Sequence, residues 1–326
     1  MIKLRMMGTP EELQRFRVVL LRMEDEGKIT IQSLSAMYAN KDTEIFSECM
    51  RKSKQRERAK KMKEKRTCRV ISVVCQKGGS GKSASATQLA VGLTRRKYRV
   101  LLIDADPQGT GSMMLGIAEP DELNETVTTV LTKIINEEPV TDAEAVIRTE
   151  EGVDLLPANI DLAGMEATLM NTMNRERILK QYVDQQRKNY DYIILDCLPS
   201  LGMITINALA ASDSTIIPTL AEYPSARGLV QLLKTVNRVR KYINPKIQVE
   251  GILLTMMDER TNYNREIAQM VSNTYGSDIR VYKTAIPRSI RMAEAGGLGK
   301  SIFLHAPNSK AAKAYRALVK EVERDV

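Results

Sequence analysis

The sequence predicts an α/β fold with a mainly parallel, doubly wound sheet, preceded by a small βαββ-like unit. From residue 69 onward, short runs rich in β-branched residues and leucine alternate with longer amphipathic stretches. A Gly-Gly-Ser-Gly loop follows the first of these runs and leads into a helical stretch. The chain has 326 residues, of which 43% are hydrophobic. It can therefore fill the core of one large α/β domain with a small appendage.

The elements of the large domain follow one another in a regular order. The apolar runs are short and apolar throughout, which is typical of parallel strands covered on both faces. The stretches between them are long enough for the helical crossovers that parallel strands need. Strands are expected at residues 69–75, 99–105, 152–158, 190–196, 214–219 and 247–255, and helices at 83–97, 225–242 and 264–276.

The N-terminal part of the chain has a different character. Residues 1–50 alternate β-like and α-like stretches, which predicts a small α+β unit. Residues 51–66 carry ten basic and two acidic side chains without an apolar stripe, which indicates a solvated helix or linker. Residues 67–326 are expected to form the large domain.

The formal net charge of +9 is unevenly distributed along the chain. Residues 1–66 hold 17 Lys and Arg against 10 Asp and Glu, and residues 227–326 hold 18 against 9. The middle segment, residues 67–226, is acidic, with 14 against 21. Basic surfaces favour nucleic acid or anionic membranes as partners, so the two ends of the chain are candidate contact regions.

Composition argues against several function classes. His305 is the single histidine, which argues against a histidine-based nucleophile system or a zinc site. Cys49, Cys68, Cys75 and Cys197 show no CxxC pair or metal-ligand spacing, so we expect reduced thiols in a cytoplasmic protein. No apolar run approaches the ~20 residues of a membrane span. The N-terminus also lacks the apolar region of a signal peptide.

The stretch VVCQKGGSGKSASATQLA, residues 73–90, predicts a phosphate-binding loop between a strand and a helix. Glycines let backbone N–H groups turn inward around a phosphate, and the helix N-terminus adds partial positive charge. Lys82 would reach the β- and γ-phosphates of a nucleotide, and the Ser83 hydroxyl would bind Mg²⁺. Gln76 replaces the first glycine of the usual GxxxxGK(S/T) pattern. The candidate phosphate-binding residues are Gly78, Gly79, Ser80, Gly81, Lys82 and Ser83.

Acidic residues end two of the predicted buried strands. Asp104 and Asp106 close the run LLIDADPQG, about one βαβ unit after the glycine loop, and Asp196 closes YDYIILD. An unpaired buried carboxylate is costly, whereas a carboxylate that holds Mg²⁺ through water has a partner. Asp196 is therefore a candidate for holding a metal ion beside the phosphate loop.

The motifs taken together resemble those of a known family. KGGSGKS resembles the deviant Walker A box of the ParA/MinD ATPases, in which the first glycine is replaced and a signature lysine, here Lys77, is added. DADPQG is similar to the second motif of that family and ILDCLPSLG to its Walker B segment. The similarity covers residues 69–323 and is typical of the Soj-like partition branch; residues 1–66 lie outside it.

The resemblance implies a homodimer in which two subunits close face to face on two ATP molecules with Mg²⁺. Lys77 would then act as a catalytic cation on the partner subunit's nucleotide, comparable to an arginine finger. Asp106 would orient the attacking water, while Asp104 and Asp196 would organise Mg²⁺ through water. Pro287 and Arg288 match a loop that lies against the adenine.

The resemblance also implies partners and a cellular role. Members of the family bind duplex DNA without sequence preference and are released when a ParB-like partner stimulates hydrolysis. The expected cargo is a plasmid, an integrative element or a chromosome origin, and the expected location is the nucleoid. Asn237 and Asp278 replace two arginines that contact DNA in the family, so nearby cations are the candidates. These DNA-binding candidates are Arg238, Arg240, Lys241 and Arg280.

Three other function classes remain open at this point. A MinD-like membrane ATPase would need bulky apolar residues in a C-terminal amphipathic helix, whereas residues 308–326 indicate a helix packed on the domain. An iron–sulfur electron carrier would need interface cysteines, whereas Cys75 and Cys197 end predicted buried strands. A transcriptional regulator with an ATPase switch would use residues 1–66 to recognise DNA, although only one convincing helix precedes residue 50. No membrane partner is expected.

Overall fold

The computed structural model describes residues 67–258 and 260–323. The chain divides into two units, Met1–Lys65 and Arg66–Val326, and the description that follows concerns the second. The predicted small unit over residues 1–50 and the basic segment 51–66 lie outside the described residues, as does Cys49.

One seven-stranded sheet forms the centre of this unit, with the strand order β3-β4-β2-β5-β1-β6-β7. All neighbouring strands are parallel except β3 and β4. The prediction of a mainly parallel sheet is confirmed. The strands are β1 (Arg69–Val73), β2 (Val100–Ala105), β3 (Ile147–Arg148), β4 (Asp154–Leu156), β5 (Tyr192–Cys197), β6 (Ser214–Leu220) and β7 (Gln248–Thr255).

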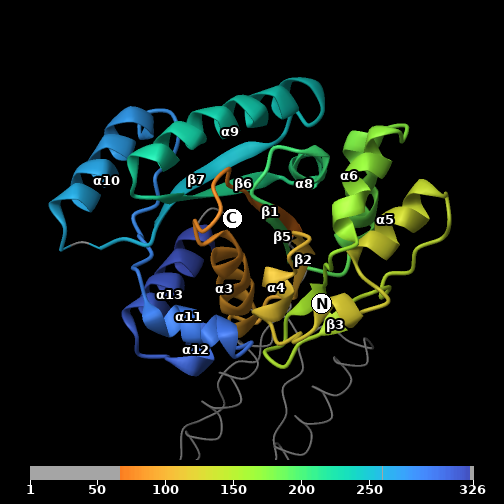
Figure 1. Cartoon of the computed structure of the whole chain (residues 1–326), viewed down its shortest axis with the longest axis horizontal. Helices are drawn as coiled ribbons and strands as arrows, with labels where there is room; N and C mark the ends of the chain where they lie inside the picture. The colour runs from red at the N-terminus through yellow and green to blue at the C-terminus, as the bar shows by residue number, and fades with distance from the viewer. Residues whose placement is uncertain (1–66, 259, 324–326) are drawn as a thin grey trace, which may run out of the picture. The chain divides into compact units, whose positions relative to one another are not determined.

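Helices cover both faces of the sheet, as a doubly wound fold requires (Figure 1). One face packs against α5 to α10 and the other against α3 and α11 to α13. The helices are α3 (Lys82–Arg95), α4 (Thr110–Met113), α5 (Val127–Ile135), α6 (Leu162–Met170), α7 (Ile178–Gln186), α8 (Met203–Ala211), α9 (Tyr223–Tyr242), α10 (Asn262–Tyr275), α11 (Ile290–Gly297), α12 (Ile302–His305) and α13 (Lys310–Glu323).

The two central strands β2 and β5 explain why the apolar runs lack alternation. Every residue of VLLIDA and YIILDC is buried, because helices pack on both faces. The helix α3 is also buried over most of its length, between the sheet and α13. Gly92 allows this close approach, since a Cβ atom there would lie 2.4 Å from Cγ2 of Val319.

The edge strand β3 was not predicted from the sequence. It contains only two residues and pairs antiparallel with β4, with Ile147 opposite Leu155. A two-residue strand has no hydrophobic period to detect, and its position depends on the loop that returns the chain to β4. The predicted strand at 152–158 is correspondingly shorter in the structure, at Asp154–Leu156.

The C-terminal helix α13 packs on the domain, as predicted for residues 308–326. Its buried side chains include Tyr315, Leu318, Val319 and Val322, which face the core beside α3. None of the helices in the described part of the chain combines the length and apolarity that crossing a bilayer requires.

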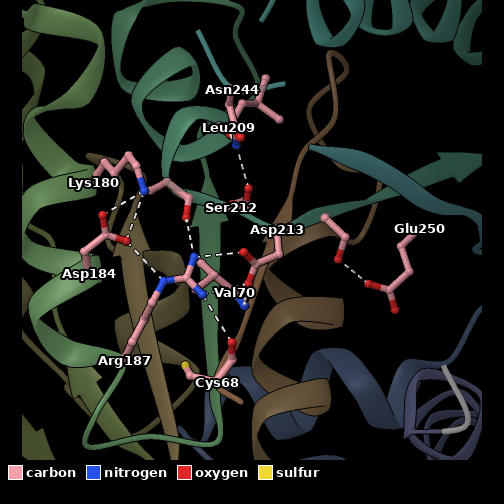
Figure 2. A network of polar contacts seen from close by, with 12 residues as sticks. Cys68, Val70, Lys180, Asp184, Arg187, Leu209, Ser212, Asp213, Asn244 and Glu250 are labelled. Carbon is pink, nitrogen blue, oxygen red and sulfur yellow. Dashed lines mark hydrogen bonds and ion pairs between the residues drawn. The ribbon is translucent and has the colours of Figure 1, made fainter. Parts of the chain in front are cut away.

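A polar network connects elements at the amino ends of the strands (Figure 2). Arg187, directly after α7, pairs with both carboxylate oxygens of Asp213 at 2.9 Å. Asp213 also accepts a hydrogen bond from the backbone N–H of Val70 in β1 at 2.8 Å, and Arg187 donates to the carbonyl of Cys68 at 3.2 Å. The network therefore joins α7, β1 and the start of β6 at the edge of the sheet opposite the glycine loop.

Candidate functional site

The sheet register brings the predicted site residues together at one edge. In a parallel sheet the carboxyl ends of neighbouring strands meet, and ligands bind beyond them. Val73 and Asp104 both pair in register with Asp196 of β5, the strand that lies between β1 and β2. The glycine loop after β1, the acidic loop after β2 and the Walker B-like segment after β5 therefore leave the sheet side by side.

The glycine loop has the conformation that its sequence requires. Gly79 and Gly81 have φ angles of +72° and +74°, a left-handed backbone that residues with a Cβ rarely adopt. The Thr255 hydroxyl of β7 donates a 2.7 Å hydrogen bond to the carbonyl of Ser80 and anchors the loop from outside. The helix α3 begins at Lys82, so its free N–H groups point into the loop.

Lys82 is buried at the centre of the site, with 6% of its surface exposed. Its Nζ atom lies 2.7 Å from Oδ1 of Asp196 and 3.3 Å from Oδ2 of Asp106, and it donates to the Ser83 hydroxyl at 3.1 Å. Burial alone would lower the pKa of Lys82, but the Asp196 and Asp106 carboxylates outweigh it and raise the pKa above its ordinary value. The ammonium group is therefore charged and already placed among the groups predicted to bind phosphate and Mg²⁺.

Asp104 accepts hydrogen bonds from Ser112 of α4 and from the start of the acidic loop. Its Oδ2 atom accepts hydrogen bonds from the backbone N–H and the hydroxyl of Ser112, both at 2.8 Å. Its Oδ1 atom accepts from the backbone N–H of Asp106 at 3.1 Å. Burial and the neighbouring Asp196 carboxylate raise the pKa of Asp104 to about 7, although the hydrogen bonds from Ser112 lower it. Asp104 therefore holds the acidic loop and α4 through hydrogen bonds, and it also lies next to the candidate metal site.

Asp196 retains one free oxygen that could hold a metal through water. Its Oδ1 atom binds Lys82, but the buried Oδ2 atom has no hydrogen-bond partner among the described residues. Burial raises the pKa of Asp196 even though Lys82 favours its charged form. Within residues 67–258 and 260–323, no group of three His, Cys, Asp or Glu side chains could hold a metal alone. The residues therefore fit a Mg²⁺ that takes most of its ligands from phosphate and water.

Asp106 is buried beside Lys82, with 6% of its surface exposed. Its Oδ1 atom accepts a hydrogen bond from the backbone N–H of Gln108 at 3.1 Å, while Oδ2 faces Lys82. The following turn contains Gly109 at φ +58°, packed closely against Ala158 and Pro120. The carboxylate is therefore held in a defined orientation, which a water-orienting residue needs.

Lys77 differs from Lys82 in position and exposure. Its side chain is 44% exposed and leaves its own site, and its Nζ atom lies 2.9 Å from Oε2 of Glu222, which is 48% exposed. Glu222 immediately precedes α9. The structure therefore does not bring the two lysines of the loop together: one is buried at the acidic cluster and the other faces outward.

A cavity of about 420 Å³ lies beside Gly81 and contains Pro287 in its wall. The neighbouring Arg288 side chain is exposed and is not part of this wall, although its backbone N–H bonds the carbonyl of Met257 at 3.1 Å. Four methionines converge on the cavity from different elements. They are Met113, Met114, Met256 and Met292.

Three of the predicted DNA-binding residues are exposed on the C-terminal half of α9. Arg240 is partly engaged there, since its Nε atom donates to the carbonyl of Ile247 at 2.8 Å. Arg238 and Lys241 continue an exposed row that begins at Lys234, four residues before Arg238. We call Lys234, Arg238 and Lys241 the α9 basic stripe.

Arg280 is separate from the α9 basic stripe. Its guanidinium lies 3.3 Å from Glu321 of α13 and 4.6 Å from the centre of the Tyr282 ring. These contacts connect the segment that follows α10 to α13. Asn237 and Asp278 are both exposed.

Several site residues were not predicted from the sequence: Lys234, Ser112, Glu222 and the cavity methionines. Lys234 could have been found from its helical spacing to Arg238. No local signal marks Ser112 or Glu222, because each meets its partner through the fold. Cys75 and Cys197 are buried, as predicted, and burial raises the pKa of both thiols.

Known proteins are similar to this chain in sequence and in fold. A family profile described as an AAA domain matches residues 68–249. The sporulation initiation inhibitor protein Soj of Bacillus subtilis (strain 168) is 43% identical over 258 residues, which cover 78% of this chain and 98% of Soj. The chromosome partitioning protein ParA of Caulobacter vibrioides (strain NA1000 / CB15N) is 38% identical over 263 residues, 79% of this chain and 96% of that protein.

A solved structure is also similar to this chain in sequence and in fold. Cobyrinic acid a,c-diamide synthase from Mycobacterium smegmatis, crystallised with bound ADP and magnesium, is 36% identical with a TM-score of 0.69. The similarity covers 79% of this chain and 94% of that one, and the same enzyme has also been crystallised with an ATP analog and magnesium. With the deviant glycine loop, the acidic loop and the Walker B-like strand all in place, the chain belongs to the ParA/Soj family of P-loop ATPases.

Proposed function

We propose that this protein is a partition ATPase that closes into a homodimer on two molecules of Mg²⁺-bound ATP. The contrast between its two loop lysines supports this proposal most directly. Lys82 is buried between Asp196 and Asp106, whereas Lys77 is exposed and directed away from its own acidic cluster. A cation in the position of Lys77 is suited to a nucleotide that a second subunit presents.

The residues of one subunit suit Mg²⁺-bound ATP. The N–H groups of the glycine loop and the Lys82 ammonium would bind the phosphates, and Ser83 would be a ligand of Mg²⁺. The free Oδ2 atom of Asp196 would hold a water of the metal. The cavity beside Gly81, with Pro287 in its wall, has room for the base. Arg288 would contribute through its backbone.

Hydrolysis would depend on groups from both subunits. Asp106 would accept a hydrogen bond from the attacking water and orient it toward the γ-phosphate. Lys77 of the partner would stabilise charge that develops on the transferred phosphoryl group, a contribution worth about 10³–10⁵ in rate for comparable arginine fingers. Turnover by the isolated protein would be slow because Asp106 of one subunit and Lys77 of its partner must both be positioned at the same nucleotide.

The cellular role we propose is the movement or spacing of a DNA cargo in the cytoplasm. The ATP-bound dimer would pair two basic surfaces, each including the α9 basic stripe, and bind duplex DNA of the nucleoid without sequence preference. A ParB-like protein on a plasmid, an integrative element or a chromosome origin would stimulate hydrolysis and release the dimer. The support is the family relationship together with the charge of the last hundred residues.

The test is binding to random-sequence duplex DNA with ATP, ADP or no nucleotide across a salt series. We expect tight binding only with ATP, with log K falling against log salt by about 0.9 per phosphate contact. Light scattering on the same samples should show dimers only with ATP. Asp106→Ala should retain the dimer and stay on DNA, whereas Lys77→Ala should lose both. DNA binding that ignores nucleotide, or normal ATP hydrolysis by Lys77→Ala, would contradict the proposal.

A further inference from the structure

Helices α6 and α8 lie on the face of the sheet that carries α5 to α10 (Figure 1). Glu166 of α6 contacts the beginning of α8. Its Oε2 atom accepts a hydrogen bond from the backbone N–H of Met203 at 2.8 Å. Its Oε1 atom accepts from the backbone N–H of Ile204 at 3.2 Å. Both donors belong to the first turn of α8, so the carboxylate of one helix caps the N-terminus of another.

The sequence of α8 leaves this cap to a distant residue. Helices begin with unpaired backbone N–H groups that a side chain at the preceding residue usually satisfies. The preceding residue here is Gly202, which has no side chain to do so. A Cβ atom on Gly202 would also lie 2.4 Å from Oε1 of Glu166, so the glycine leaves room for the carboxylate. The two residues therefore form a matched pair.

The capped helix end adjoins the Walker B-like segment. Residues 198–202 connect Asp196 and Cys197 at the end of β5 with the first turn of α8. Because β5 lies between β1 and β2, this connection leaves the sheet between the glycine loop and the Asp106 loop. One end of the connection is fixed by β5, and the other is fixed by the two bonds to Glu166.

The segment that precedes α6 contacts α4 and the turn at Asp121, both of which follow the acidic loop. The backbone N–H of Ala158 donates to the Ser112 hydroxyl at 3.3 Å, and that hydroxyl donates to Asp104. The backbone N–H of Ile160 donates to Asp121 at 3.0 Å. Asp104 also accepts from the backbone N–H of Asp106. The segment before α6 is therefore linked to the loop that carries Asp106, and Glu166 of α6 is linked to the connection that follows Asp196.

We propose that Glu166 is a positioning residue for ATP hydrolysis, which holds the connection 198–202 in register with the Asp106 loop. This inference rests on the proposed function, because it assumes that the site turns over ATP. The carboxylate of Glu166 is bonded to α8 and not to the glycine loop, so it should affect the hydrolytic step and leave nucleotide binding intact. A displacement of about 1 Å in such a support can cost on the order of 10²-fold in rate.

The experiment compares Glu166→Ala and Glu166→Gln with the full-length wild type. For Glu166→Ala we expect kcat to fall by about 10-fold or more, with the Kd of a fluorescent ATP analog unchanged. Amide hydrogen exchange at Met203 and Ile204 should accelerate in the same variant. Glu166→Gln keeps one acceptor oxygen and should lose less activity, and it preserves the test if the alanine variant folds poorly.

Asp213→Asn is the matched control. Asp213 also accepts a backbone hydrogen bond, from Val70, but lies at the opposite edge of the sheet. The substitution Asp213→Asn should lower the melting temperature of the protein without changing kcat. An unchanged kcat in both Glu166 variants, or an equal loss in Asp213→Asn, would overturn the positioning role. If the wild type itself hydrolysed no ATP with DNA and partner present, the proposed function would fail instead.

Discussion

At the scale of single residues, the site depends on two lysines five positions apart. Lys82 sits among three carboxylates at the edge of the sheet, where burial makes each charge depend on its neighbours. Lys77 forms an exposed pair with Glu222, and such pairs contribute at most about 1 kcal/mol. Removal of Lys82 should therefore affect both stability and function, whereas removal of Lys77 should affect function alone.

Lys82→Ala should abolish nucleotide binding and lower the free energy of unfolding. The substitution leaves Asp196 and Asp106 without their shared cation, and breaking a buried pair costs about 3–5 kcal/mol. Lys77→Ala should keep both the free energy of unfolding and nucleotide affinity, while ATP-dependent dimerisation disappears. Urea denaturation and titration with a fluorescent ATP analog measure these quantities. Equal destabilisation by the two substitutions would contradict this assignment.

At the scale of elements, α9 presents its cations on one side while its other side enters the core. Leu229, Leu232, Val236 and Val239 are buried. The residues of the α9 basic stripe are exposed on the other side of the helix. The helical period therefore predicts which of its cations are available to a partner. Arg240, which bonds the carbonyl of Ile247, is also needed for the turn into β7.

Replacement of Lys234 and Lys241 by alanine should weaken ATP-dependent DNA binding. The slope of log K against log salt should become shallower by about 0.9 for each phosphate that the variant no longer neutralises. The matched control is Lys313→Ala with Lys320→Ala, since these two exposed lysines are also seven residues apart, on α13. Equal weakening by the two pairs would show that overall charge, and not α9, determines the affinity.

Close packing between α3 and α13 gives a second prediction at this scale. Gly92→Ala would place a methyl group 2.4 Å from Val319, so it should lower the free energy of unfolding by about 1–3 kcal/mol. Val319→Ala in the same chain should recover part of the loss. Gly164→Ala, in α6 with nothing within 4 Å of the added methyl, should be neutral or stabilising by up to about 1 kcal/mol. Thermal or urea unfolding would measure all three.

At the scale of the whole molecule, charge is divided along the chain. The last hundred residues hold 18 basic and 9 acidic side chains, while residues 67–226 hold 14 and 21. The acidic cluster of the site belongs to the acidic middle, and the α9 basic stripe belongs to the basic end. The carboxylates and Lys82 therefore come from the acidic middle, whereas the proposed DNA-binding cations come from the basic end, which also contributes Pro287 to the cavity beside Gly81.

Deletion of residues 1–66 should leave ATP binding and ATP-dependent dimerisation intact. All the site residues described above lie within residues 67–323, so the remaining chain contains the complete nucleotide site. Affinity for DNA should fall equally with and without ATP if the basic segment adds only non-specific attraction. Equilibrium binding of nucleotide and DNA to the shortened chain tests both statements. Loss of nucleotide binding would refute the predicted boundary between residues 66 and 67.

Much of the fold and the core of the site could be predicted because the relevant signals are local. The strands β1, β2 and β5 appear as short apolar runs, and the residues that follow them carry the glycine loop and the carboxylates. Parallel strands end at one edge of the sheet, so the sequence places Asp104, Asp106, Asp196 and Lys82 at that edge. The strand order β2-β5-β1 in the structure makes them neighbours. The edge strand β3 escaped prediction because two residues carry no period.

The sequence by itself determined the α/β class, the phosphate loop and the residues that surround it. These features depend on chain spacing and on the conformational freedom of glycine, which act within a few residues. Only the tertiary structure decided that Lys77 pairs with Glu222, that Ser112 holds Asp104 and that Glu166 caps α8. Each of these contacts joins groups from separate elements, and their distance is set by how helices pack on the sheet.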